Sequence, residues 1–167
     1  PNPDAQESRG LGDVYKRQIC VSPDAGGIER TRGLAKKINA DLAIIDKRRP
    51  QAGKSQVMNV IGEIKNKNCI IVDDIIDSGG TIVNAVEALI KKGAKDVHVF
   101  VTHAVLSGDA VNKIRKSKIK KLIITDTIDN SRRIKNVGKI QVLSIAPLMA
   151  EAIKRISNST SVSDLFN

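Results

Sequence analysis

Three carboxylates and a glycine turn lie close together in the middle of the chain. Asp73 and Asp74 end an apolar run, Asp77 comes three residues after Asp74, and Ser-Gly-Gly-Thr follows. The acidic pair Asp73 and Asp74 would repel a phosphate, and it suits sugar hydroxyls, a divalent cation, or both. The glycine turn suits an anion, because it turns backbone N–H groups toward one point at a helix start. This stretch therefore predicts a sugar-phosphate site.

The elements around this stretch place it at a ligand-binding edge. Cys69–Val72 has the length and β-branched content of a strand buried on both faces. The segment Thr81–Ile90 has apolar residues at helical spacing. Ligands of open α/β sheets bind where such strands end. The candidate phosphate donors are the N–H groups around Gly79 and Gly80, together with the hydroxyls of Ser78 and Thr81. An ordinary acidic strand-to-helix connection is the alternative.

Two further segments follow predicted strands. Val21–Gly27 places Asp24 before a pair of glycines, so Asp24 is a metal ligand or a helix cap, and the residues alone favour the cap. Asp46–Pro50 carries three cations and leads into a polar stretch, which predicts a mobile loop able to close over polyphosphate. A solvated basic loop fits equally well. In an extended segment Lys47 and Arg49 point to the same side.

Strand and helix patterns alternate along most of the chain. The predicted strands are 19–21, 42–45, 69–72, 97–101, 122–124 and 140–143. The predicted helices are 28–38, 81–92, 109–116 and 147–156. Such alternation predicts an α/β fold, a parallel sheet with helices on both faces. Residues 1–18 show no periodicity and are expected to form a disordered leader, with one domain over 19–167.

Composition narrows the classes of partner. The 167 residues carry a net charge of +10, which implies anionic partners. Aromatic residues make up only 2% and none lies among the basic clusters, so we expect phosphorylated small molecules and no nucleic acid. Cys20 and Cys69 lie in strand-like runs and are expected to be reduced core residues. No stretch approaches the ~20 apolar residues of a membrane span. We therefore expect a cytoplasmic protein without membrane contact.

Five motifs together carry a family resemblance. They are V-S-P-D-A-G-G, A-I-I-D-K-R-R-P, V-D-D-I-I-D-S-G-G-T, T-H-A-V-L-S-G-D-A and the closing S-V-S-D-L-F. From about Ile19 to the end, the chain resembles the C-terminal half of the ribose-phosphate pyrophosphokinases, which have a type I phosphoribosyltransferase-like fold. The D-D-x-x-D-S-G-G-T element is shared with many type I phosphoribosyltransferases. The D-K-R-R-P loop is the discriminating motif.

The resemblance implies an activity and a role for each site residue. The reaction is transfer of the pyrophosphoryl group of ATP to the 1-hydroxyl of ribose 5-phosphate, with Mg²⁺. By position, the resemblance assigns the catalytic role to Lys47 and Arg49. It assigns binding of the ribose hydroxyls to Asp73 and Asp74 and binding of the 5-phosphate to Asp77–Thr81. It assigns the magnesium ion to Asp24. This last assignment reverses the preference for a cap.

The resemblance also implies what this chain lacks. Family members are about twice as long, form homo-oligomers, commonly hexamers, and take most ATP contacts from an N-terminal half. We therefore expect this chain alone to bind ribose 5-phosphate weakly and to turn over little ATP. The rival functions are a base-salvage phosphoribosyltransferase, which would lack the D-K-R-R-P loop, and a non-catalytic regulatory subunit. Such a subunit would be expected to lose site carboxylates or loop cations, and none is lost among the positions present.

Overall fold

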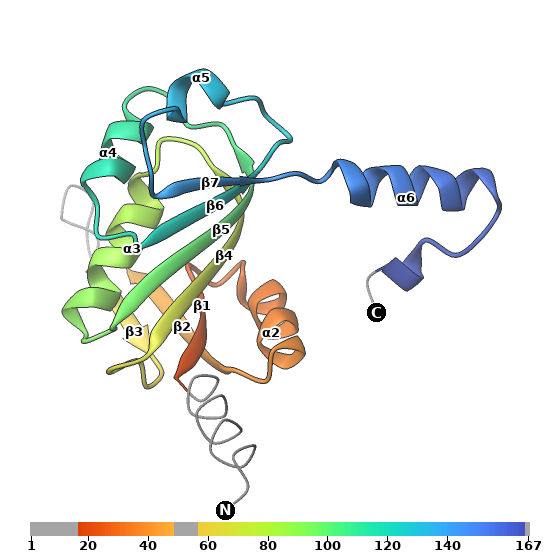
Figure 1. Cartoon of the computed structure of the whole chain (residues 1–167). Coiled ribbons are helices and arrows are strands. Elements are labelled where there is room, and N and C mark those ends of the chain that lie inside the picture. The colour runs from red at the N-terminus through yellow and green to blue at the C-terminus, as the bar shows by residue number, and fades with distance from the viewer. Residues whose placement is uncertain (1–16, 49–56, 166–167) are drawn as a thin grey trace, which may run out of the picture.

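The computed structural model describes residues 17–48 and 57–165, and its centre is one sheet (Figure 1). The described strands run in the order β3-β2-β1-β4-β5-β6-β7. Their bounds are β1 (Gln18–Ser22), β2 (Asp41–Arg48), β3 (Val57–Ile61), β4 (Asn68–Ile76), β5 (Asp96–Ala104), β6 (Lys121–Thr125) and β7 (Ile140–Leu143). The helices are α2 (Ile28–Lys37), α3 (Gly80–Lys91), α4 (Ala110–Lys116), α5 (Ser131–Ile134) and α6 (Ala146–Ser157), followed by the 3-10 helix η1 (Ser163–Leu165).

The parallel sheet predicted from the sequence is confirmed, with one antiparallel edge. All six predicted strands and all four predicted helices are present, and β1, β2, β4, β5, β6 and β7 pair in parallel. Strand β3 was not predicted. It pairs antiparallel with β2, with Lys47 opposite Met58.

Two predicted strand ends were wrong. The segment predicted as a loop from Asp46 begins as strand, because β2 continues to Arg48 through its ladder with β3. Strand β4 was expected to end at Val72 but continues to Ile76, since Asp73, Ile75 and Ile76 still pair with β5. Asp73 and Asp74 therefore lie within the strand, and the ladder pairs Asp73 with Val101 on β5.

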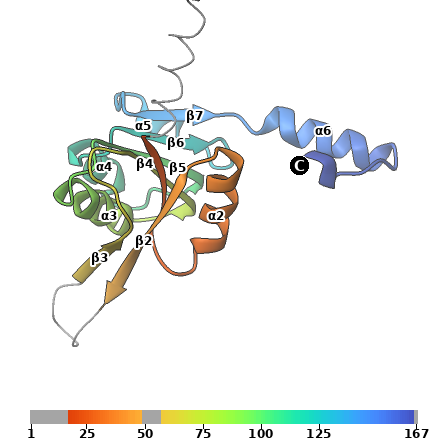
Figure 2. The same ribbon diagram turned by 90° about the horizontal axis from the view of Figure 1, so that it is seen from below.

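Helices cover both faces of the sheet, but unevenly. Helix α2 lies on one face beside β1 and β2, while α3 and α4 lie on the opposite face (Figure 1, Figure 2). Between the sheet and the α3–α4 layer is an aliphatic core that includes Ile71, Val86, Leu89, Val99 and Leu122. This packing fixes the position of the β4–α3 connection.

Several sequence predictions fall at the limits of the described chain. Residues 1–16, which make up most of the predicted leader, and Arg49 in the predicted basic loop lie outside it. Cys20 and Cys69 are buried free thiols, as predicted. None of the helices in 17–48 and 57–165 is long and apolar enough to cross a bilayer.

Candidate functional site

The carboxyl ends of β1 and β4 open into a cavity of about 390 Å³. Its lining residues are Asp24, Asp73, Asp74, Ile75, Ile76, Asp77, Ser78, Gly79, Thr81 and Ile82. The structure thus brings together the carboxylates and the glycine turn that the sequence singled out. Parallel strands end at the same edge of a sheet, and the cavity lies at that edge.

The turn between β4 and α3 has the geometry of an anion-binding loop. Gly79 precedes α3 with φ 75°, a left-handed conformation that favours glycine. The helical hydrogen bonds begin with Val83, whose N–H binds the Gly79 carbonyl at 3.0 Å. The first N–H groups of α3 therefore have no partner within the helix, and no side chain caps it. Asp77, Ser78 and Thr81 are exposed around these donors.

Neighbouring elements hold this turn in place. The N–H of Ser107 donates to the Asp77 carbonyl at 3.1 Å. On α4, the Lys113 ammonium lies 3.4 Å from the Ser78 carbonyl oxygen. The loop thus has a fixed backbone and a cation close by, both of which favour a bound phosphate.

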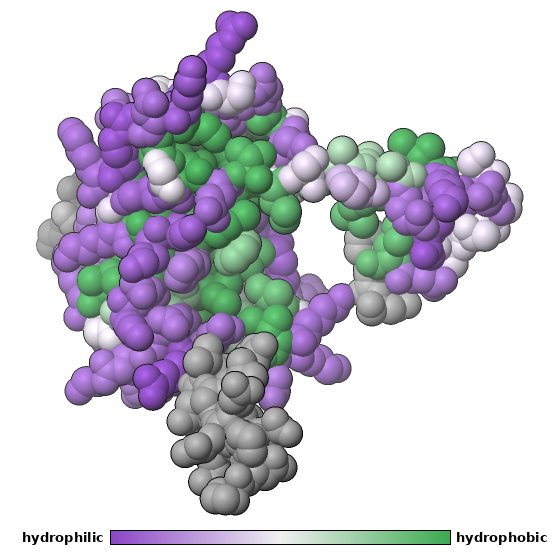
Figure 3. Space-filling view, in the orientation of Figure 1, coloured by the Kyte–Doolittle hydropathy of each residue, from purple (hydrophilic) through white to green (hydrophobic). Residues whose placement is uncertain are grey.

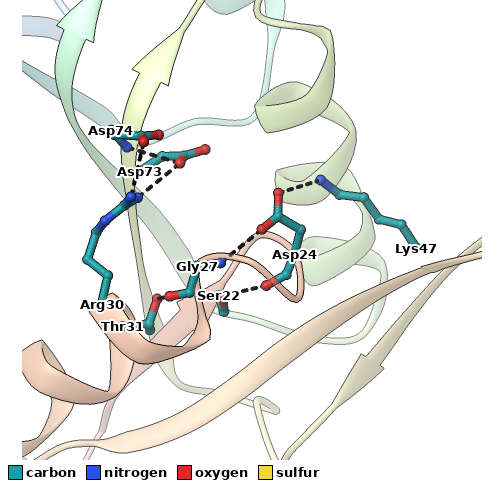
Figure 4. A network of polar contacts seen from close by, with 8 residues as sticks. All are labelled: Ser22, Asp24, Gly27, Arg30, Thr31, Lys47, Asp73 and Asp74. Carbon is teal, nitrogen blue, oxygen red and sulfur yellow. Dashed lines mark hydrogen bonds and ion pairs between the residues drawn. The ribbon is translucent and has the colours of Figure 1, made fainter.

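The acidic pair on β4 is held by an arginine from α2. The Arg30 guanidinium donates to Asp73 Oδ1 at 3.3 Å and lies 3.1 Å from Asp74 Oδ2 (Figure 4). The Asp73 side chain is 19% exposed and that of Asp74 59%. The two carboxylates are therefore in unlike environments although they are adjacent in sequence.

Their environments separate the pKa values of the pair. Burial, and then the neighbouring Asp74 carboxyl, raise the pKa of Asp73. The hydrogen bond with Asp73 lowers the pKa of Asp74, and the Arg30 charge lowers it further. Asp73 is the member that takes up a proton first as the pH falls. An ionised Asp74 remains as an acceptor for a hydroxyl.

Asp24 makes two contacts of different kinds. Its Oδ1 accepts the Gly27 N–H at 3.0 Å, which fixes the turn that leads into α2. Its Oδ2 lies 3.6 Å from the Lys47 ammonium on β2 (Figure 4). The helix cap that the residues alone favoured for Asp24 was wrong, because the N-cap residue is Gly27 and no side chain caps α2. The second oxygen faces a cation across the cavity edge.

A metal at this site would depend on ligands beyond the described side chains. Among residues 17–48 and 57–165, no group of three or more His, Cys, Asp or Glu side chains surrounds a common point. Asp24 offers one hard carboxylate oxygen beside the cavity. Magnesium is often held by one or two carboxylates, waters and substrate phosphates, so this donor fits that ion.

Arg30 is the site residue that the sequence analysis missed. It lies in the first turn of α2, where the helix dipole disfavours a cation. That mismatch was the available signal, since a basic residue there needs a carboxylate partner nearby. The partners are 43 and 44 residues further along the chain, and no local pattern links them.

The fold and the site together correspond to a known family. Residues 45–167 match the model of the phosphoribosyl synthetase-associated domain, and the chain belongs to that family. It is similar to ribose-phosphate pyrophosphokinases of Bradyrhizobium diazoefficiens, with 53% identity over 161 residues, and of Hyphomonas neptunium, with 55% over 150 residues. These matches cover 95% and 89% of this chain, but 51% and 48% of those relatives.

A solved structure also matches most of this chain over about half of its own length. The phosphoribosylpyrophosphate synthetase of Mycobacterium smegmatis is 35% identical, with a TM-score of 0.77 over 92% of this chain and 49% of that one. An APRTase of Giardia lamblia, 14% identical with a TM-score of 0.53 over 72% of this chain and 74% of its own, shares the fold. The chain spans about half the length of the curated relatives described above.

Proposed function

We propose that this chain is the ribose 5-phosphate-binding half of a ribose-phosphate pyrophosphokinase. The parent reaction transfers the pyrophosphoryl group of ATP to the 1-hydroxyl of ribose 5-phosphate. The observation that carries the proposal is the single cavity in which an anion-binding turn and an acidic pair lie side by side. A pentose phosphate is a ligand with both chemistries in one molecule.

The turn and the acidic pair would bind different parts of ribose 5-phosphate. The N–H groups at the start of α3, with Ser78 and Thr81, would donate to the 5-phosphate. Asp73 and Asp74 would accept hydrogen bonds from the ribose hydroxyls, and Arg30 would keep the two carboxylates in position. Such binding orients the 1-hydroxyl before transfer, which removes much of the entropic cost of the reaction.

Lys47 and Arg49 would act on the group being transferred. Phosphoryl-type transfer depends on positioning and charge neutralisation more than on a protein nucleophile. Lys47 already lies at the cavity edge through Asp24. Its ammonium would stabilise the charge that develops on the phosphates. We assign Arg49 the same task by the family resemblance.

Mg²⁺ is part of the proposal, with Asp24 as its protein ligand. When bound, the ion would neutralise the charge of the ATP phosphates. The family resemblance also supplies ATP as second substrate, a cytoplasmic location and hexameric assembly of the intact protein. The half absent from this chain would supply most ATP contacts, so we expect little turnover by the chain alone.

The proposal is tested by calorimetric titration with ribose 5-phosphate in the presence of Mg²⁺. Wild-type chain is compared with Asp77→Ala, and Glu87→Ala serves as a control because Glu87 is an exposed acid further along α3. Weaker binding by Asp77→Ala alone is expected. Equal affinity of the wild type and both variants for ribose 5-phosphate would contradict the assignment of the phosphate site to this turn. Robust product formation from ATP by the chain alone would contradict the proposal that the other half of the parent protein supplies most ATP contacts.

A further inference from the structure

The connection between β5 and α4 supports the anion-binding turn through its backbone. We call residues 104–107 of this connection the supporting loop. Within it, the N–H of Leu106 donates to the Ile76 carbonyl and the N–H of Ser107 donates to the Asp77 carbonyl, both at 3.1 Å. Ile76 is the last residue of β4, and Asp77 is the first residue after it. The supporting loop therefore sets the direction in which the chain leaves β4 and enters the turn.

The supporting loop has a conformation that needs partners. Leu106 has φ 52°, in the left-handed region, although it is not glycine. Its side chain is completely buried. A residue with a side chain is strained in this conformation, and the conformation persists only where the surroundings hold it. Contacts from outside the loop must therefore fix its backbone.

Two side chains from the segment after β6 make such contacts. The Asn130 amide donates to the Ala104 carbonyl at 2.6 Å, and Asn130 is only 5% exposed. The Arg133 guanidinium donates to the Val105 carbonyl at 3.2 Å and also to the Leu106 carbonyl. Two side chains thus bind three successive carbonyls. The planar guanidinium fixes the orientation of its two acceptors as well as their distance.

The Asn130 side chain binds the supporting loop instead of its own helix. Asn130 is the N-cap residue of α5, where an asparagine side chain usually accepts an N–H of the first helical turn. It makes no capping hydrogen bond here, and its amide also donates to the Ile128 carbonyl at 3.3 Å. Asp129 Oδ1 accepts the Ser131 N–H at 2.9 Å and so helps to fix the start of the helix. Asn130 therefore connects α5 to the supporting loop.

Helix α5 lies at the surface, at the upper end of the body in Figure 1, and none of its residues is buried. Figure 3 shows hydrophilic residues on the surface at that end. Arg133 is itself exposed, so it connects α5 to the supporting loop through its hydrogen bonds. Its neighbour Arg132 is also exposed but does not share these hydrogen bonds. The two arginines differ in their contacts and not in their charge.

From these contacts we infer that Asn130 and Arg133 are positioning residues for the 5-phosphate of ribose 5-phosphate, an inference that rests on the proposed function. Neither belongs to the described residues that line the cavity of about 390 Å³. They act through the supporting loop, which holds Ile76 and Asp77 so that the N–H groups at the start of α3 converge on the phosphate. Backbone donors bind an anion well when they are already in place before it arrives.

Calorimetric titration of the full 167-residue chain with ribose 5-phosphate tests Arg133. Arg133→Leu should weaken binding about tenfold, because two hydrogen bonds that hold the supporting loop are lost. Arg132→Leu is the matched control, since it removes the same charge from the same helix and leaves those hydrogen bonds in place. Arg133→Lys keeps the charge and a donor, and should restore part of the affinity. Equal losses in Arg132→Leu and Arg133→Leu, or no loss in either, would overturn the inference.

Asn130 is tested in the same titration. Asn130→Asp keeps the shape of the side chain but replaces the donor with a carboxylate, so it should weaken binding at least as much as Arg133→Leu. Because Asn130 is buried, circular dichroism checks that the variant is folded, and Asn130→Ala takes its place where it is not. Wild-type affinity in a folded Asn130 variant would overturn the role assigned to Asn130.

Amide hydrogen exchange separates positioning from a general loss of stability. In Arg133→Leu, exchange should become faster at the N–H groups of Leu106 and Ser107 and stay unchanged in β1. Faster exchange throughout the sheet, or weaker binding without any change at these two N–H groups, would overturn the inference. A wild-type chain that does not bind ribose 5-phosphate would overturn the proposed function and this inference with it. A wild type and an Arg133→Leu variant that bind equally would overturn this inference alone.

Discussion

The ammonium of Lys47 lies 3.6 Å from Oδ2 of Asp24, across the edge of the cavity. Lys47 lies on β2 and Asp24 follows the end of β1, and the family resemblance assigned them opposite duties, a cation for phosphates and a carboxylate for magnesium. Their contact means that the lysine occupies the oxygen that the metal would need. Under the proposed function, the phosphates of a bound substrate would separate the two, because their oxygens would accept from the Lys47 ammonium and also coordinate Mg²⁺.

This contact predicts that Lys47 weakens binding of free Mg²⁺. Lys47→Met should strengthen Mg²⁺ binding by about three- to tenfold, since a cation at this distance near the surface repels the ion by ~1 kcal/mol. Calorimetry with Mg²⁺ alone measures the change. Lys67→Met is the matched control, because Lys67 pairs with Asp41 elsewhere on the sheet. Unchanged Mg²⁺ affinity in Lys47→Met would contradict the competition.

Removing the charge of the Asp73 carboxylate should stabilise the fold by an amount that depends on pH. Burial raises its pKa in the fold, so ionising it disfavours the folded state once the pH exceeds the ordinary carboxyl pKa of about 3.9. Asp73→Asn should therefore raise the Tm by a few degrees at neutral pH. Below that pKa the carboxyl is protonated in both states, and the gain should vanish.

Thermal melts between acidic and neutral pH check this expectation. Glu87→Gln serves as the control, since Glu87 is exposed on α3. A Tm gain that grows toward low pH would show that the sign is wrong. The same Asp73→Asn protein should bind ribose 5-phosphate less well, so that stability and binding change in opposite directions.

Two glycine substitutions should have opposite effects on stability. Gly79→Ala is expected to cost about 1–2 kcal/mol, because φ is +75° there and an added Cβ meets only ordinary contacts near Ala110. Gly33→Ala, inside α2 with nothing within 4 Å of its Cβ, should stabilise the fold by about 1 kcal/mol. Urea unfolding of both variants measures the difference. An unchanged free energy of unfolding in Gly79→Ala would contradict the backbone strain expected for a side chain at this position.

The two cysteines should be inert in the folded protein. Burial raises the pKa of Cys69 to about 12 and also raises the pKa of Cys20. Both thiols are 0% exposed. A thiol reagent at neutral pH should label neither residue until denaturant unfolds the chain, and should then label both. Rapid labelling under native conditions would show that the strands open locally.

The sequence by itself determined the local parts of the site. The apolar run in β4, the carboxylates that follow this run, the glycine turn and the periodicity of α3 are patterns of neighbouring residues, so they can be recognised without tertiary contacts. The turn at Gly79 illustrates this, because a left-handed position before a helix selects glycine locally. For the same reason the alternation of strands and helices sufficed to predict the parallel sheet.

The tertiary structure decided what depends on distant partners. Strand β2 reaches Lys47 because β3 pairs with it, and Arg30 holds carboxylates more than forty residues away. The helical pattern of α6 predicted an apolar side but not what covers it, and the structure leaves Ile153 exposed. Pairing, ion-pair geometry and burial are properties of elements brought together in space. A one-dimensional pattern specifies each element and cannot specify its neighbour.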